Sequence, residues 1–331
     1  MNKRTIIFRA DGSPTIGMGH FIRTLALAEM LNKHFHCIYA TRRPTSYQIN
    51  EIEKVCHERI DLPKDDSHFE YFLSLLTGNE IVVLDNYYFD TDYQHSIKAK
   101  GCKLVCIDDM HDKHYVADVV INHAEGIGHE AFSMDSGTKL LSGYKYALIR
   151  KEFREQNQIP CKNKYSCMVM MGGADPLGIT NKIIHSLQQI EFDKPIAVVN
   201  GIAKKNNPVQ VGDKFRFFDK LNAKEISQLM MESDFGILPA STVAIEACAV
   251  RLPFICGYFV DNQKEIYKGI KKRQLALCIG EFNYTEDSVW VSFVQQISQA
   301  KTQRILRLAQ KEVLDKEMSN RYIKIFYQLS C

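Results

Sequence analysis

Short, continuously hydrophobic segments alternate with periodic segments along the first half of this 331-residue chain. Continuous runs predict strands, and hydrophobic residues that recur every three or four positions predict helices. Strands are expected at 5–9, 36–40, 81–84, 103–107 and, as the last parallel strand, 116–122; helices are expected at 19–33, 47–56 and 68–76, with a short strand between the last two. Continuous hydrophobic strands separated by helices are typical of a parallel sheet covered on both faces.

The same alternation starts again after a polar, charged stretch, and we place a domain junction at 150–164. Strands are then expected at 165–170, 196–199, 215–218, 235–238 and 254–256, and helices at 178–190, 223–232, 241–250, 263–272, 287–300 and 302–328. The sequence therefore predicts an α/β fold of two doubly wound, Rossmann-like domains, residues 1–153 and 160–331, that face a cleft. Ligands of such sheets bind at the carboxyl ends of the strands.

Composition narrows the classes of function. The net charge of +3 is too small to indicate a nucleic-acid partner, but it suits an anionic small ligand such as a nucleotide diphosphate. The ten cysteines are scattered and form no Cys-x-x-Cys pair, which is typical of a reducing compartment. We see no signal peptide and no apolar run of about 18 residues. A cytoplasmic protein without membrane insertion is expected.

The segment Gly17-Met18-Gly19-His20 lies between the first strand and the first helix. Two glycines permit a sharp turn and close approach of the backbone to a ligand, and the helix presents N–H groups there. A histidine at that position can act as a proton acceptor near neutral pH. A plain tight turn is the alternative. Binding of NAD is not indicated, because Ile22 stands where the dinucleotide fingerprint requires a third glycine.

Three segments of the second half could bind a nucleotide sugar. Backbone N–H groups around Gly172 and Gly173 could hold phosphate oxygens, unless this is a simple strand–helix corner. Ser241 and Thr242 begin a helix on which Glu246 could accept hydrogen bonds from ribose hydroxyls, or be an ordinary surface carboxylate. The side chains of Asn262 and Gln263 could bind sugar hydroxyls or acetamido groups, or cap a helix.

Polar residues also end strands of the first half. They are Asp11 on the loop before the glycine turn, the segment Asp85-Asn86-Tyr87, and the segment from Asp108 to His114. The last of these combines ligand types that bind metals, although such loops are often merely solvated.

Taken together, these residues resemble the UDP-sugar hydrolases of pseudaminic acid biosynthesis. The resemblance runs from Arg4 to about Lys272. It rests on Phe8-Arg9-Ala10-Asp11-Gly12-Ser13, Ile16-Gly17-Met18-Gly19-His20 with Arg23, Asp85-Asn86-Tyr87, Ile107-Asp108-Asp109, Tyr146-Ala147-Leu148-Ile149-Arg150 with Glu152-Phe153, Met171-Gly172-Gly173-Ala174-Asp175, Ser241-Thr242-Val243-Ala244-Ile245-Glu246-Ala247 and Asn262-Gln263.

The resemblance implies a GT-B-like fold and hydrolysis of UDP-2,4-diacetamido-2,4,6-trideoxy-β-L-altropyranose by water, without a metal or another cofactor. Inversion at the anomeric carbon is expected because a single displacement by water inverts it. His20 would be the general base, and the second domain would hold UDP. The implied substrate contacts are Asp11, Gly17, Gly19, Tyr87, Gly172, Gly173, Ser241, Thr242, Glu246, Asn262 and Gln263.

Two other classes of function remain open. In a glycosyltransferase of the same fold, His20 would deprotonate an acceptor hydroxyl instead of water. A protein that only binds UDP-sugars would not need a base at this position, so the presence of His20 argues against that alternative.

Overall fold

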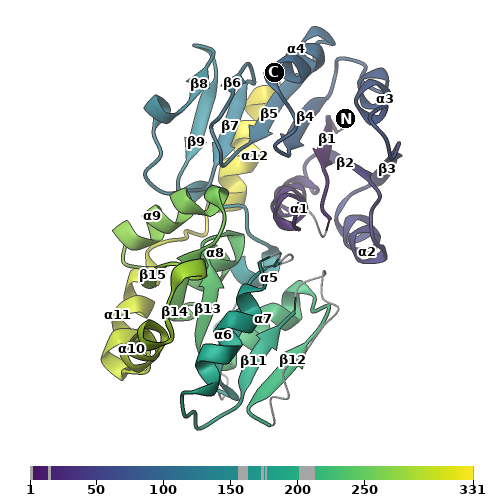
Figure 1. Cartoon of the computed structure of the whole chain (residues 1–331). Coiled ribbons are helices and arrows are strands. Elements are labelled where there is room, and N and C mark those ends of the chain that lie inside the picture. Colours follow the sequence, from purple (N-terminus) through teal and green to yellow (C-terminus); the bar gives the residue numbers. More distant parts are fainter. Residues whose placement is uncertain are drawn as a thin grey trace. The chain divides into compact units, whose positions relative to one another are not determined.

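Two parallel β-sheets organise the chain, and each belongs to its own structural unit (Figure 1). The computed structural model describes residues 3–13, 16–155, 163–172, 175, 177–200 and 213–330. The first unit comprises Met1–Gly12, His20–Leu148 and Asp315–Cys331, and the second comprises Ser13–Gly19 and Ile149–Leu314.

The first unit is built on a seven-stranded parallel sheet in the order β3-β2-β1-β4-β5-β7-β9. Its strands are β1 (Thr5–Ala10), β2 (His36–Arg42), β3 (Glu58–Leu62), β4 (Ile81–Asp85), β5 (Lys103–Ile107), β7 (Val119–Asn122) and β9 (Lys139–Ser142), with a separate pair of β6 (His114–Tyr115) and β8 (Ser133–Met134). Its helices are α1 (Gly19–Leu31), α2 (Ser46–Val55), α3 (His68–Ser74), α4 (Thr91–Ala99) and α12 (Met318–Leu329), and its 3-10 turns are η1 (His129–Ala131) and η2 (Tyr144–Tyr146).

The second unit repeats this plan with a six-stranded parallel sheet in the order β12-β11-β10-β13-β14-β15. Its strands are β10 (Tyr165–Met170), β11 (Ile196–Val199), β12 (Phe215–Phe218), β13 (Ser233–Pro239), β14 (Phe254–Tyr258) and β15 (Leu277–Glu281). Its helices are α5 (Lys151–Arg154), α6 (Ile179–Gln188), α7 (Ala223–Met231), α8 (Thr242–Ala249), α9 (Lys264–Lys272), α10 (Asp287–Ile297) and α11 (Ala300–Lys311), with the 3-10 turns η3 (Asp261–Gln263) and η4 (Phe282–Tyr284).

Each sheet is buried because its strands are hydrophobic on both faces. In the first unit, the core on one face includes Val82, Leu104 and Val120, against which Phe72 of α3 and Ile97 of α4 pack. In the second unit, the core includes residues of α6 and α10 together with the strands: Val169, Ile183, Val198, Ile237, Ile255 and Trp290. The predicted α/β fold with two doubly wound, Rossmann-like sheets is thus confirmed.

The C-terminal helix corrects the predicted domain assignment. Residues 160–331 were expected to form the second domain, but α12 belongs to the first unit. Phe326 of α12 packs edge-to-face on Phe35, with 6.2 Å between ring centroids, and the Tyr322 hydroxyl donates to the Tyr146 carbonyl at 2.7 Å. The single helix expected at 302–328 is accordingly two helices, α11 and α12, that lie in different units.

Further elements also differ from the prediction. Strand β9 lies beyond β7, so the segment expected at 116–122 is not the last parallel strand of the first sheet. Strand β15 and helix α4 were not expected at all. Across the described ranges, no helix is long and apolar enough to cross a membrane.

Candidate functional site

The carboxyl edge of the first sheet gathers acidic residues from three adjacent strands. Asp11 follows β1, Asp85 is the last residue of β4, and Asp109 comes two residues after β5. From β1 the chain first adds strands on one side, β2 and β3, and then continues on the other side with β4 and β5. Doubly wound sheets bind ligands at the point between these two halves, here between β1 and β4. The side chains around Asp85, at the end of β4, therefore form the candidate site.

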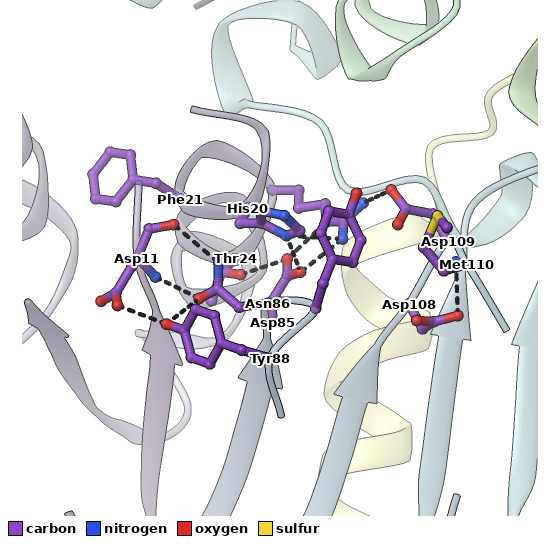
Figure 2. A network of polar contacts seen from close by, with 12 residues as sticks. Asp11, His20, Phe21, Thr24, Asp85, Asn86, Tyr88, Asp108, Asp109 and Met110 are labelled. Carbon is purple, nitrogen blue, oxygen red and sulfur yellow. Dashed lines mark hydrogen bonds and ion pairs between the residues drawn. The ribbon is translucent and has the colours of Figure 1, made fainter. Parts of the chain in front are cut away.

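His20 contacts Asp85 directly. Its Nδ1 lies 2.6 Å from Oδ1 of Asp85, and both side chains are buried (Figure 2). Arg23 donates to both oxygens of the same carboxylate at 2.6 Å, and the Thr24 hydroxyl donates to Oδ2 at 2.9 Å. These three partners lie three and four residues apart on α1, so one face of the helix presents all of them to Asp85. The contact fixes the orientation of the imidazole ring.

Arg23 also binds a second carboxylate. Its Nη1 donates to Oδ2 of Asp109 at 2.6 Å, so one guanidinium bridges the ends of β4 and β5. Burial, the largest single effect, raises the pKa of the Asp85 carboxyl, but the charge of Arg23 and the hydrogen bonds of Arg23 and His20 together outweigh it and lower that pKa to about 2. The pKa of Asp109 is lowered for the same reason, against burial. Both carboxylates are ionised, so this cluster holds two negative charges and one guanidinium.

Tyr87 lies beside His20. The two rings meet edge-to-face with 4.5 Å between centroids and 79° between planes, and Tyr87 remains 38% exposed. Two residues that the sequence singled out are thus brought together, one buried and one at the surface.

Asp11 is bound within its own unit. Its carboxylate accepts hydrogen bonds from Arg9 at 2.6 Å, from Arg42 Nε at 2.6 Å and from the Tyr88 hydroxyl at 2.6 Å, and its backbone N–H donates to Asn86. Burial raises its pKa, yet the Arg9 charge and these hydrogen bonds hold it well below the usual range. Both oxygens of this carboxylate thus have donors within the chain, and the expected substrate contact of Asp11 stays a prediction.

The glycine turn has the geometry that its sequence suggested. Gly17 has φ of +80°, a conformation that a side chain would strain, and its carbonyl accepts from the Ser13 N–H at 3.2 Å. Gly19 starts α1, and a Cβ built on it would contact nothing within 4 Å. Space next to Gly19 is consistent with close approach of a ligand.

The acidic and histidine-containing loop after β5 is held together by its own residues. Oδ2 of Asp108 accepts from the N–H group of Met110 at 3.0 Å (Figure 2). It also accepts from the N–H group of His111 at 2.5 Å. Burial and the neighbouring Asp109 raise the pKa of Asp108. Within the part of the chain that the structure describes, no three His, Cys, Asp or Glu side chains are grouped as metal ligands.

Glu246 has a partner that the sequence did not indicate. Its Oε1 and Oε2 accept from Nε and Nη2 of Arg150, both at 2.7 Å, and its side chain is 1% exposed. Interpretation of Glu246 as an ordinary surface carboxylate is therefore wrong. The pair joins the segment before α5 to helix α8 within the second unit.

The glycine segment after β10 is partly described. Gly172 has φ of +88°, whereas Gly173 lies outside the described residues. The carboxylate of Asp175 accepts from the N–H groups of Ile179 and Thr180, both at 2.8 Å. Because Asp175 already caps α6, an anion would have to use other donors, such as the turn itself or the start of α8.

The remaining candidates lie at the start of two helical segments. Ser241 occupies the N-cap position of α8, but its side chain makes no cap hydrogen bond, and Thr242 is 9% exposed. The side-chain oxygen of Gln263 accepts from the Phe259 N–H at 3.0 Å, which holds the loop before α9. Asn262 is half-buried next to it.

The sequence indicated His20 and Glu246, but it did not indicate the side chains that contact them. Arg23, Asp109 and Arg150 were given no role of their own. Arg23 lies one helical turn after His20, so its position on the same helix face was a usable signal. The pairing of Arg150 with Glu246 joins residues 96 positions apart, and no local pattern indicates it.

Comparisons with known proteins agree with this architecture. No protein-family model matches the chain. It is 25% identical over 282 residues to the UDP-2,4-diacetamido-2,4,6-trideoxy-beta-L-altropyranose hydrolase of Campylobacter jejuni, covering 81% of this chain and 96% of that protein. It is 23% identical over 314 residues to the spore coat polysaccharide biosynthesis protein SpsG of Bacillus subtilis, covering 91% and 90%.

Solved structures show the class of fold. MurG of Acinetobacter baumannii is 12% identical with a TM-score of 0.66, covering 98% of this chain and 99% of that one. A UDP-glucosyltransferase of Polygonum tinctorium is 12% identical with a TM-score of 0.71, covering 100% and 99%. The chain thus has the GT-B fold of glycosyltransferases, and these two likenesses extend to the fold alone.

Proposed function

We propose that this protein hydrolyses a UDP-activated 2,4-diacetamido-2,4,6-trideoxyhexose to UDP and the free sugar, with inversion at the anomeric carbon. The observation that carries the proposal is the buried His20–Asp85 contact at the carboxyl edge of the first sheet. The named hydrolase of Campylobacter jejuni, similar over 81% of this chain, supports the choice of substrate and reaction.

His20 is the proposed general base. An ionised carboxylate can only accept, so Asp85 requires the proton of the neutral ring on Nδ1 and leaves the lone pair on Nε2. Water attacks the anomeric carbon, its proton passes to Nε2, and the bond from that carbon to the β-phosphate oxygen breaks. The proton balances the surplus negative charge of Asp85 and Asp109 over Arg23.

Tyr87 is proposed to contact the sugar, because its ring is exposed and packs on the base. Gly17 and Gly19 allow the sugar and diphosphate to approach the backbone of the turn. Asp11 contributes indirectly, by holding the loop between β1 and that turn.

The second unit is proposed to bind UDP. Glu246 accepts hydrogen bonds from the ribose hydroxyls through lone pairs that Arg150 does not use, since a carboxylate offers about four acceptor sites. Gly172, Gly173, Ser241 and Thr242 supply donors for the diphosphate, and Asn262 and Gln263 contact the sugar. Backbone amides and a helix N-terminus stabilise the charge that develops on the departing UDP, so no general acid is needed.

Incubation of the purified protein with the UDP-sugar and no acceptor tests the proposal. Stoichiometric release of UDP and free sugar is expected. UDP release that occurs only after an acceptor alcohol is added would instead make the protein a glycosyltransferase, and tight binding without release would make it a binding protein.

A further inference from the structure

His123 is a buried histidine that the proposed chemistry leaves unused. It follows β7 directly and is 3% exposed. Neither ring nitrogen has a hydrogen-bond partner among the described residues. Buried polar groups in folded proteins are almost always hydrogen-bonded, because an unpaired one costs free energy of folding. Such a group points to a partner that the chain does not itself supply.

The sheet register places His123 beside the ion cluster. Strands β5 and β7 are parallel neighbours in which Ile107 pairs with Ile121, and the Asp108 N–H continues the ladder to the Ile121 carbonyl at 3.0 Å. Asp109 and His123 each lie two residues beyond that pair. Arg23, which binds Asp109 and Asp85, is close enough to act on the charge state of His123.

The imidazole of His123 is uncharged. Burial, and then the positive charge of Arg23, lower its pKa to about 4, against the opposing effect of Asp109. At neutral pH the ring therefore offers one donor and one acceptor. Oδ1 of Asp109 is a second buried atom without a partner among the described residues, and it can only accept. Together they offer complementary groups to a ligand that both donates and accepts.

We propose that His123 and Oδ1 of Asp109 form a subsite for a secondary amide of the sugar. The amide N–H donates to Asp109, and the amide carbonyl accepts from the protonated ring nitrogen of His123. A hydroxyl also donates and accepts, but it does both through one oxygen atom, whereas an amide presents its donor and its acceptor on separate atoms. The amide suits two separate protein partners better, so we expect the subsite to prefer acetamido sugars over their hydroxyl counterparts. The assignment rests on the proposed function in that the ligand is the sugar of a UDP-sugar.

Binding of three probes tests the subsite without requiring turnover. Affinities for UDP, UDP-glucose and UDP-N-acetylglucosamine are measured by calorimetry with the wild-type chain, His123→Leu and His123→Gln. The exposed His129 provides the matched control, His129→Leu. The wild type is expected to prefer the acetamido probe, and His123→Leu to lose about tenfold for that probe alone. His123→Gln, which keeps a donor and an acceptor, is expected to retain part of the preference.

The proposal would be overturned if His123→Leu kept the wild-type preference for UDP-N-acetylglucosamine over UDP-glucose and had a higher melting temperature. Removal of an unpaired imidazole that binds nothing should stabilise the fold. If His123→Leu does not fold, the ¹⁵N shifts of the wild-type His123 ring carry the test. UDP-N-acetylglucosamine should move them and UDP should not; equal responses would overturn the proposal. A preference that depends on His123 without hydrolysis of any UDP-sugar would retain the subsite and reject the hydrolase.

Discussion

The guanidinium of Arg150 donates one hydrogen bond to each carboxylate oxygen of Glu246, both at 2.7 Å, and the carboxylate is almost completely buried. Such a bidentate contact holds the carboxylate in one orientation, which a ribose-binding acceptor needs. The Arg150 side chain also packs over the Phe153 ring, with 4.9 Å between its Cζ and the ring centroid. Arg150 is therefore positioned by α5 and in turn positions Glu246.

Loss of this carboxylate is expected to weaken nucleotide binding. Glu246→Ala removes charged hydrogen bonds worth roughly 1.5–3 kcal/mol, so affinity for UDP should fall by about tenfold to a hundredfold. Arg150→Lys keeps the charge but not the bidentate geometry, so a smaller loss is expected. Calorimetry with UDP measures both, with the exposed Glu191→Ala as control. A dissociation constant unchanged in Glu246→Ala would show that the pair is purely structural.

Replacement of the proposed base should affect turnover and not nucleotide binding. His20→Asn keeps a polar side chain but cannot take up a proton at Nε2, so kcat should fall by about 10²–10⁴-fold. The affinity for UDP should remain that of the wild type, because the proposed nucleotide contacts of Glu246 lie in the second unit. Steady-state kinetics and calorimetry separate the two effects, with His129→Asn as control. Near-normal turnover would exclude His20 as the base.

Asp85 is expected to matter for both activity and acid stability. Its pKa is lowered from 3.8 to about 2 in the folded protein, so the unfolded chain takes up the proton first. The stabilisation, about 2 kcal/mol by linkage, is complete above pH 4 and is lost as the pH falls through about 2. Asp85→Asn should abolish this part of the acid dependence in denaturant titrations.

The same variant leaves the buried Arg23 with one carboxylate fewer. Loss of one partner of a buried ion pair typically costs about 3–5 kcal/mol, and the unfixed tautomer of His20 should lower kcat by about 10²–10⁴-fold. The exposed Asp135, paired with His114 at 3.0 Å, provides the control variant Asp135→Asn, which should change little. A fully active and equally stable Asp85→Asn would contradict the positioning role.

Much of the fold could be predicted because local pattern determines it. The bounds of β10, β11 and β12 agree with the segments expected at 165–170, 196–199 and 215–218. These strands are short hydrophobic runs between polar turns, which is a local signal. Helix α12 was assigned to the wrong domain because its contact with Phe35 joins the two ends of the chain, and periodicity does not reveal which sheet a helix covers.

In the candidate site too, some residues could be predicted from a local motif and others could not. The glycine turn and His20 are adjacent in the sequence, so a local motif could indicate them. The partners of His20 could not be predicted, because Asp85 lies 65 residues away and becomes a neighbour only through the pairing of β1 with β4. The burial of Glu246 likewise depends on Arg150, 96 residues earlier.

Activity is expected to be independent of divalent cations. The one loop that suggested metal binding uses the carboxylate of Asp108 to hold its own backbone. Turnover measured after dialysis against EDTA should therefore equal that of the untreated protein. Loss of activity that Mg²⁺, Mn²⁺ or Zn²⁺ restores would require a metal in the proposed reaction.

Hydrolysis in ¹⁸O-enriched water tests the central claim most directly. The protein is incubated with the UDP-diacetamido-trideoxyhexose and no acceptor, and both products are analysed by mass spectrometry as soon as they form. Attack of water on the anomeric carbon predicts one ¹⁸O atom in the free sugar and none in UDP. Label in the phosphate of UDP, or no release of UDP until an acceptor is supplied, would contradict it.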